Sequence, residues 1–266
     1  MLNLFETAFD CLMEWDPDRK VEQTRAMAKR WRDGGLAMAD WDAPRPVEQA
    51  GRPPRPELVQ PKQLPRRTLA HEQGRAALIH AVTHIEFNAI NLAWDAVYRF
   101  RGLPEGYYAD WIGVADDEAR HFLALRGRLR ELGHDYGDFP AHNGLWRMAL
   151  RTAHDPLARM ALVPRVLEAR GLDVTPDMIE RLRNAGDEAT AEILEMVLRE
   201  EVGHVAAGSR WFKHLCRERG LDPESTFFEL LTEFQRGEIR CPLHLEARRE
   251  AGFSETELER LKALCR

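Results

Sequence analysis

Apolar residues recur every three or four positions along most of the chain, the spacing typical of helices with one buried face. The pattern predicts helices over residues 67–101, from about 104 to 133, from 144 past 168 with a break at 154–156, and from 176 to 220 with a restart after Gly186. No stretch alternates apolar and polar residues as a strand does, and β-branched runs are scarce. The expected fold class is therefore all-α.

The pattern also predicts where the last two long helices reverse direction. A single straight helix starting at Pro176 would carry residue 201 about 37 Å from its start, at 1.5 Å per residue. We therefore expect residues 176–185 to continue the third helix, with the turn near Ala185-Gly186-Asp187.

The first 66 residues differ from this helical body. Two short helices are predicted, over residues 3–14 and from Asp16-Pro17 to Gly34-Gly35, followed by a stretch with seven of the fifteen prolines. Prolines in this density favour an extended arm. Residues 44–67 contain six basic residues and two acidic ones, which leaves two interpretations open: a strap packed on the helices, or a basic edge facing an anionic substrate.

Residues 221–266 form a predicted C-terminal helical extension, with helices near 223–236 and 254–265. Between them, Cys241-Pro242-Leu243-His244 is interpreted as a surface loop, since a metal site there would need a second ligand pair. The predicted domains are thus 1–66, 67–220 and 221–266.

Composition and charge limit the partners and the cellular location to be expected. The net charge of −6 argues against a protein wrapped in nucleic acid. The four cysteines (Cys11, Cys216, Cys241 and Cys265) form no C-x-x-C pair, and we expect reduced thiols. The chain starts without a signal-peptide pattern and has no apolar run long enough for a bilayer, so a cytoplasmic protein is expected.

Carboxylates and histidines interrupt the apolar faces of all four long helices at matched places. Glu118 and His121 form a Glu-x-x-His pair, and Glu201 and His204 repeat it. The two remaining helices each carry one carboxylate on the apolar face, 32 residues before Glu118 and 33 before Glu201. The six candidate metal ligands are Glu86, Glu118, His121, Glu168, Glu201 and His204.

Four carboxylates and two imidazoles are the set that holds two iron or manganese ions in a helix-bundle core. The alternative is a set of buried polar pairs without metal, but six such groups would be costly to bury without a cation. His80 and His84 lie about 120° and 200° away from the face of Glu86, at 100° per residue. We interpret these two histidines as packing residues, as residues that support a metal ligand, or as pocket-edge residues, rather than as ligands themselves.

The stretch Asp117-Glu118-Ala119-Arg120-His121 resembles the D-E-x-R-H motif of bacterial di-iron monooxygenases of the ferritin-like superfamily. That resemblance implies that Asp117 hydrogen-bonds a metal-bound histidine. In the second motif Glu200 stands where the aspartate would be. Most of the chain resembles an uncharacterised bacterial family of ferritin-like proteins, through residues 84–86, 117–121, 168–173 and 200–204. The tRNA-modifying di-iron hydroxylases are more distant relatives, and the implied fold is a ferritin-like four-helix bundle.

Two functional hypotheses follow. The first is an O₂-activating di-iron oxidoreductase, such as a hydroxylase, with two Fe ions (or Mn, or a mixed pair) and an unknown electron donor. The second is iron handling or defence against oxidative stress, as ferroxidase or in peroxide removal. The substrate is a small molecule or tRNA; the basic arm supports RNA, and the net charge opposes it.

Overall fold

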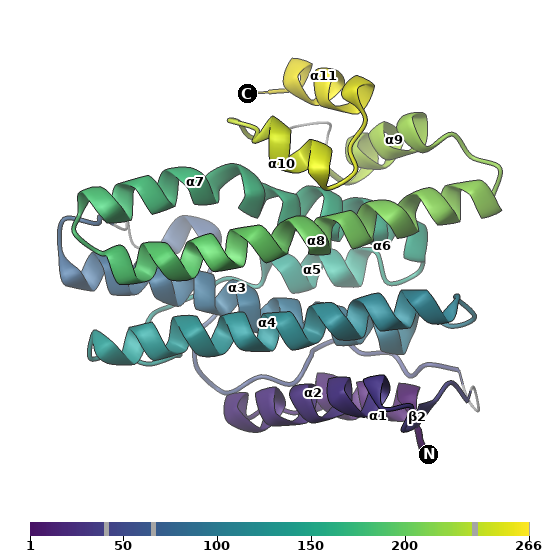
Figure 1. Ribbon diagram of the computed structural model, residues 1–266, viewed down its shortest axis with the longest axis horizontal. Coiled ribbons are helices and arrows are strands. Elements are labelled where there is room, and N and C mark those ends of the chain that lie inside the picture. The colour runs from purple at the N-terminus through teal and green to yellow at the C-terminus, as the bar shows by residue number, and fades with distance from the viewer. Residues whose placement is uncertain (40–42, 65–67, 236–238, 266) are drawn as a thin grey trace. The chain divides into compact units, whose positions relative to one another are not determined.

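The computed structural model describes residues 1–39, 43–64, 68–235 and 239–265. The chain forms two compact units, residues 1–150 and 151–266. The regular secondary structure of their described residues is almost entirely helical, so the predicted all-α class is confirmed (Figure 1). The strands β1 (Leu2–Asn3) and β2 (Leu36–Ala37) pair in parallel near the N-terminus. The predicted domain boundary at 66/67 lies outside the described residues, and the one at 220/221 stays a prediction.

The first unit is built on two long helices that run side by side, α3 (Glu72–Arg99) and α4 (Glu105–Glu131) (Figure 1). Gly102 adopts a φ of 70° in the short turn between them, a conformation that glycine tolerates best. Pro104 follows as the N-cap of α4. The tight turn makes the two helices antiparallel neighbours, which brings the middle of α3 beside the middle of α4.

Two N-terminal helices cover this pair, as the sequence predicts. They are α1 (Leu4–Met13), packed on α3, and α2 (Pro17–Arg32), packed on α4. The side chains of Asn3 and Asp16 cap their first turns. Lys20 of α2 is fully buried and donates hydrogen bonds to the carbonyls of Cys11 and Leu12 and to Asn91 Oδ1.

The described part of the proline-rich arm is extended apart from the short 3₁₀ turn η1 (Pro61–Gln63). Gly51 N donates to Leu12 O at 2.9 Å, and Trp146 Nε1 donates to Glu48 O at 2.9 Å. Near its end, Leu58 forms a β-bridge with Ala141. The arm therefore packs along the first unit, as the strap interpretation predicts; a role toward an anionic substrate stays a prediction.

The second unit is also built on a pair of helical segments. One consists of α6 (Pro156–Leu162), the π-helical segment η2 (Val163–Glu168) and α7 (Ala169–Asn184), which follow one another without a break. The other is α8 (Glu188–Glu218), which packs against all three (Figure 1). The helix continues through Pro176, and Gly186, at φ 76°, marks the turn. The predicted continuation of residues 176–184 and the reversal near Gly186 are confirmed. Helix α5 (Gly144–Arg151) lies where the two units meet in sequence.

The C-terminal extension contains α9 (Pro223–Gln235), α10 (Leu245–Glu250) and α11 (Glu255–Ala263). The sequence did not predict α10, which has only six residues. Cys241 and Cys265 form a disulfide, so the expectation of four reduced thiols is wrong; Cys11 and Cys216 are free and buried. Because 24 residues separate the bonded pair, only the folded backbone reveals their proximity.

Among the described helices, none combines the length and the apolar character needed to cross a bilayer.

Candidate metal centre

Three of the six candidate ligands meet inside the first unit. Glu86 comes from the middle of α3, and Glu118 and His121 lie one helical turn apart on α4. Their residues are 3%, 1% and 0% exposed, respectively. Each offers a potential ligand atom within 4.8 Å of those of the other two. The antiparallel pairing of α3 and α4 thus converts separate sequence positions into one cluster.

The cluster contains two carboxylates and one imidazole. His121 Nδ1 lies 3.4 Å from Glu118 Oε2 and 3.7 Å from Glu86 Oε2. In the described part of the structure, Glu86 Oε2 is buried and accepts no hydrogen bond. Burial and the nearby Glu118 carboxylate raise the pKa of Glu86 to about 8. Burial lowers the pKa of His121, but the Glu118 and Glu86 carboxylates outweigh it and raise that pKa to about 11.

Two causes combine in these shifts: burial of the groups away from water, and the negative charge of two neighbouring carboxylates. Two ionised carboxylates beside one imidazolium would still leave a net charge of −1 away from water, which is costly. A bound divalent cation would offset that charge, and carboxylate oxygen with imidazole nitrogen is a donor set suited to iron, manganese or zinc. The residues present therefore fit a metal ion.

The second unit holds the other three candidates. Glu201 and His204 lie one turn apart on α8, with His204 Nδ1 3.4 Å from Glu201 Oε1. His204 is buried, and the Glu201 side chain is 13% exposed. Glu168 is the last residue of η2, and its Oε2 atom is buried. The segment η2 packs against α8, so the lone carboxylate and the Glu-x-x-His pair of this unit lie on neighbouring elements.

Glu168 lies on the only π-helical segment in the described ranges, a feature that the sequence did not predict. A π-segment widens the helix locally and is frequent at functional sites. Pro164, which cannot donate a backbone hydrogen bond to a regular α-helix, lies inside this segment.

The two residues expected to support the ligands are less buried. The Asp117 side chain is 40% exposed, and its Oδ1 accepts from Arg120 Nη2 at 2.6 Å. Glu200 is half-buried on α8. The predicted hydrogen bonds that metal-bound histidines would donate to these carboxylates stay predictions.

A buried polar cluster that the sequence did not predict adjoins the candidate ligands in the first unit. Its centre is Tyr136, whose hydroxyl lies 2.9 Å from His84 Nδ1. Asn88 Nδ2 donates to His84 Nε2 at 3.1 Å, so Nδ1 carries the imidazole proton and donates to the tyrosine. His80 Nε2 accepts from Gly137 N. Burial, with a contribution from His80, lowers the pKa of His84 to about 3 and keeps it neutral.

Both ring nitrogens of His84 are thus engaged, which agrees with its interpretation as a packing residue. The Tyr136 ring packs at 5.2 Å from those of Phe87 and Phe122, the residues that directly follow Glu86 and His121. No sequence motif marks this tyrosine, because it lies in the loop after α4.

Comparison with known proteins gives a family without an assigned activity. A Haemophilus influenzae protein described as an uncharacterized protein is 48% identical over 214 residues, which cover 78% of this chain and 74% of that protein. No solved structure matches the chain. The family model described as "Protein of unknown function (DUF455)" matches residues 13–259, almost the whole chain. The chain therefore belongs to the DUF455 family of proteins of unknown function.

Proposed function

We propose that this protein is a ferritin-like, dinuclear metal oxidoreductase that activates O₂, with iron as the metal it uses. In this proposal Glu86, Glu118 and His121 of the first unit act together with three ligands of the second unit. Those three ligands are Glu168, Glu201 and His204. Each unit would contribute one helix pair to a four-helix bundle.

The observation that carries the proposal is the buried cluster of Glu86, Glu118 and His121. Their potential ligand atoms lie within 4.8 Å of one another. A fold that gains nothing from a cation would be more stable with apolar residues at these positions. The cluster therefore indicates selection for binding rather than for stability.

The residues of the second unit are the reason for proposing two metal ions rather than one. It repeats the same residue types: a lone carboxylate followed 33 residues later by a Glu-x-x-His pair. In dinuclear carboxylate proteins, bridging carboxylates hold the two ions and histidines ligate one ion each. In this chain Glu86, Glu118, Glu168 and Glu201 would hold the ions through carboxylate oxygens, and His121 and His204 through imidazole nitrogens.

Two reduced iron ions would supply the electrons that O₂ activation requires. The chain itself holds the ions and limits the access of water. Phe87 and Phe122 are buried, directly follow Glu86 and His121, and have ring centres 5.6 Å apart, so apolar groups that exclude water lie on these two helices. Manganese, or a mixed pair, would fit the same donor set.

The substrate class within this proposal is a small organic molecule, with tRNA as the alternative. The basic residues of the proline-rich arm favour RNA, whereas the net charge of −6 disfavours it. Titration with tRNA at low and high salt separates the two, because binding through phosphates weakens steeply with salt.

Metal content is the decisive measurement. We expect anaerobic reconstitution with Fe(II), followed by desalting, to leave about two iron ions per chain. Admission of O₂ should then change the optical spectrum, because the iron is oxidised. Glu118→Ala should lose most of the iron. The matched control is Glu105→Ala, which changes an exposed glutamate in the first turn of the same helix.

Equal iron content in wild type and Glu118→Ala would contradict the proposed site. Iron loading far above two per chain would instead favour the alternative function in iron storage or ferroxidase chemistry.

A further inference from the structure

The π-segment that carries Glu168 is held by a buried ion pair from the C-terminal part of the chain. Arg165 of η2 is 0% exposed, and its Nη2 donates to Glu257 Oε1 of α11 at 2.7 Å. The guanidinium lies 4.3–4.8 Å from the ring centres of Phe212, Phe227 and Phe253. A buried arginine needs its partner charge, because water cannot replace it. Glu257 therefore constrains the helix three residues before Glu168.

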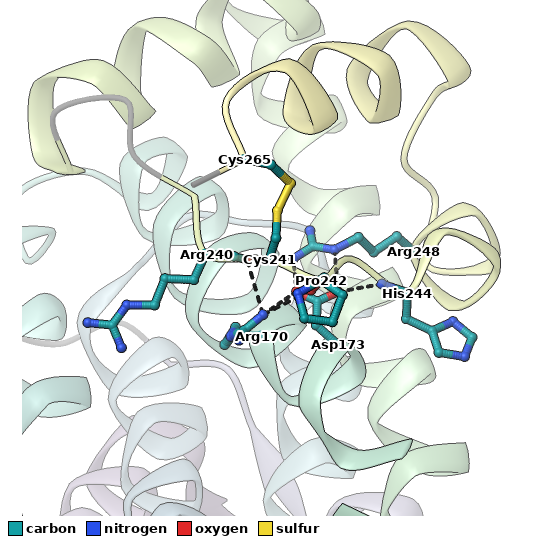
Figure 2. The surroundings of a disulfide bond; sticks show 8 residues. All are labelled: Arg170, Asp173, Arg240, Cys241, Pro242, His244, Arg248 and Cys265. Atoms are coloured by element: carbon teal, nitrogen blue, oxygen red, sulfur yellow. Dashed lines mark hydrogen bonds and ion pairs between the residues drawn. A yellow bond between two sulfur atoms is a disulfide. The ribbon is translucent and has the colours of Figure 1, made fainter. Parts of the chain in front are cut away.

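A second set of contacts holds the same helix after Glu168. Asp173 of α7 has a fully buried side chain that accepts two hydrogen bonds from Arg248 of α10, at 2.9 and 2.7 Å. It also accepts from the backbone N–H of His244 at 2.9 Å. Arg170 Nη1 donates to the carbonyls of Arg240 and Pro242, both at 3.0 Å. Figure 2 shows these contacts converging on Asp173 and Arg170.

The hydrogen-bond partners named above (Glu257, Arg248, His244, Arg240 and Pro242) all belong to one segment, residues 239–265, and a disulfide closes it. Cys241 lies at its start and Cys265 at its end, with a Cα–Cα distance of 5.5 Å (Figure 2). A β-bridge between Ile239 and Cys265 lies beside the bond. Within the segment, Glu257 Oε2 also accepts from Ser254 N in the capping box that starts α11. The disulfide thus fixes the two ends of the segment to each other. Residues between those ends contact the helix before Glu168, at Arg165, and after it, at Asp173.

We propose that the disulfide-closed segment 239–265 positions Glu168, and that reduction of Cys241–Cys265 by a dithiol weakens metal binding at the proposed centre. This inference rests on the proposed function for the role of Glu168 and adds a means of regulating it. The contacts of Arg165 and Asp173 lie three residues before and five residues after the ligand. Loss of either contact would let the π-segment shift and move the carboxylate out of place.

The chemistry is thiol–disulfide exchange. A thiolate of the dithiol attacks one sulfur of the Cys241–Cys265 bond, forms a mixed disulfide and releases the other cysteine as a thiolate. The second thiolate of the reagent then displaces the first cysteine. Two electrons pass from the dithiol to the disulfide, the two cysteine thiolates take up protons, and the dithiol becomes a disulfide. Cys241 and Cys265 are both partly exposed, unlike the buried Cys11 and Cys216, so a reagent can reach them.

The first test is hydrogen exchange of the metal-free full-length protein, with and without dithiothreitol. Thiol titration in denaturant should give two thiols before reduction and four after it. We expect amides of residues 163–173 to exchange on the order of tenfold faster after reduction, while those of α3 are unchanged. Unchanged exchange at 163–173 would overturn the proposal, whether or not the protein binds metal.

The second test measures Fe(II) affinity of the oxidised and reduced protein. We expect binding about tenfold weaker after reduction, the usual scale for losing a group that orients a ligand. Equal affinities would overturn the link between the segment and the metal. Absence of metal binding in the oxidised wild type would instead contradict the proposed function and, with it, the metal-control part of this proposal. Hydrogen exchange would still decide whether the segment holds the helix.

A variant that keeps the disulfide separates positioning from redox chemistry. Glu257→Gln removes the partner charge of Arg165, and we expect it to weaken Fe(II) binding about as much as reduction does. Its matched control is Glu255→Gln, an exposed position on the same helix that pairs with Arg249 at the surface. If Glu257→Gln binds Fe(II) as tightly as Glu255→Gln, the positioning role is wrong. Circular dichroism of both variants checks that each is folded.

Discussion

Gly208 of α8 lies directly against Pro164 of the π-segment: a Cβ atom added to Gly208 would approach Pro164 Cγ to within 2.3 Å. The absence of a side chain at position 208 is what lets the proline ring fit there. Pro164 lies four residues before Glu168 in its helix, and Gly208 lies four residues after His204 in α8. Two helices that each carry candidate ligands therefore approach closely at this point.

Gly208→Ala should destabilise the protein even though alanine is the better helix former. Alanine gains up to about 1 kcal/mol in helix propensity, but the clash with a rigid ring costs about 1–3 kcal/mol. Urea unfolding should show a net loss of stability. Gly203→Ala is the control on the same helix, since its Cβ would meet nothing within 4 Å. That variant should be stabilised, and equal effects at the two positions would contradict the packing argument.

Lys20 should make stability rise with pH. Burial lowers its pKa to about 7, although Cys11 and Glu14 act in the opposite direction, whereas the unfolded chain retains a value near 10.5. Between these values the unfolded state binds more protons, so stability increases as pH rises from 7 to 10.5, by on the order of 3–5 kcal/mol.

Urea unfolding at several pH values tests this, with Lys20→Met as the variant. The difference in unfolding free energy between wild type and Lys20→Met should change across the window in favour of wild type. Lys29→Met changes an exposed lysine of the same helix and should leave the wild-type slope intact. Parallel curves for wild type and Lys20→Met would show that Lys20 does not titrate there.

The sequence predicted the long helices, the turn near Gly186 and the six candidate ligands, because each depends on spacing along one helix. Glu118 and His121 share a face whatever the rest of the fold does. Other features depend on which distant residues meet. Tyr136 reaches His84 from a loop, and Glu257 meets Arg165 from 92 residues away.

The π-segment was missed for a related reason. Pro164 signals a disturbance of the helix, but its form depends on Gly208 across the interface. The disulfide likewise depends on a loop conformation that spacing cannot give. The joint action of the two half-sites remains a prediction, which metal stoichiometry will test.

Tyr136→Phe should destabilise the first unit through His84. Removing the hydroxyl deletes a buried hydrogen bond to His84 Nδ1, which costs about 0.5–1.5 kcal/mol. A double-mutant cycle with His84→Leu isolates the pair, because in that background the hydroxyl has lost this imidazole partner. The sum of the stability losses in the two single variants should therefore exceed the stability loss in the double variant. Strictly additive losses would contradict coupling between the two side chains.

Glu86→Gln should have opposite effects on the metal-free and metal-bound protein. Burial and Glu118 raise the pKa of Glu86 to about 8, against 4.5 in the unfolded chain. The folded state therefore binds more protons between these values, and its stability falls as pH rises from 4.5 to 8. Glutamine cannot ionise, so metal-free Glu86→Gln should be more stable than wild type at pH 8 and closer to it at pH 5.

With metal the order should reverse. A metal at 100 times its Kd stabilises the wild type by about 2.7 kcal/mol, and Glu86→Gln loses a carboxylate ligand and most of that gain. Thermal unfolding with Mn(II) and with a chelator, at both pH values, measures both effects, with Glu105→Gln as the exposed control. If Glu86→Gln is the less stable protein under all four conditions, Glu86 serves the fold rather than a metal. If Glu86→Gln is the more stable protein without metal at pH 8 and the less stable one with Mn(II), the Glu86 carboxylate destabilises the metal-free fold and stabilises the metal-bound protein.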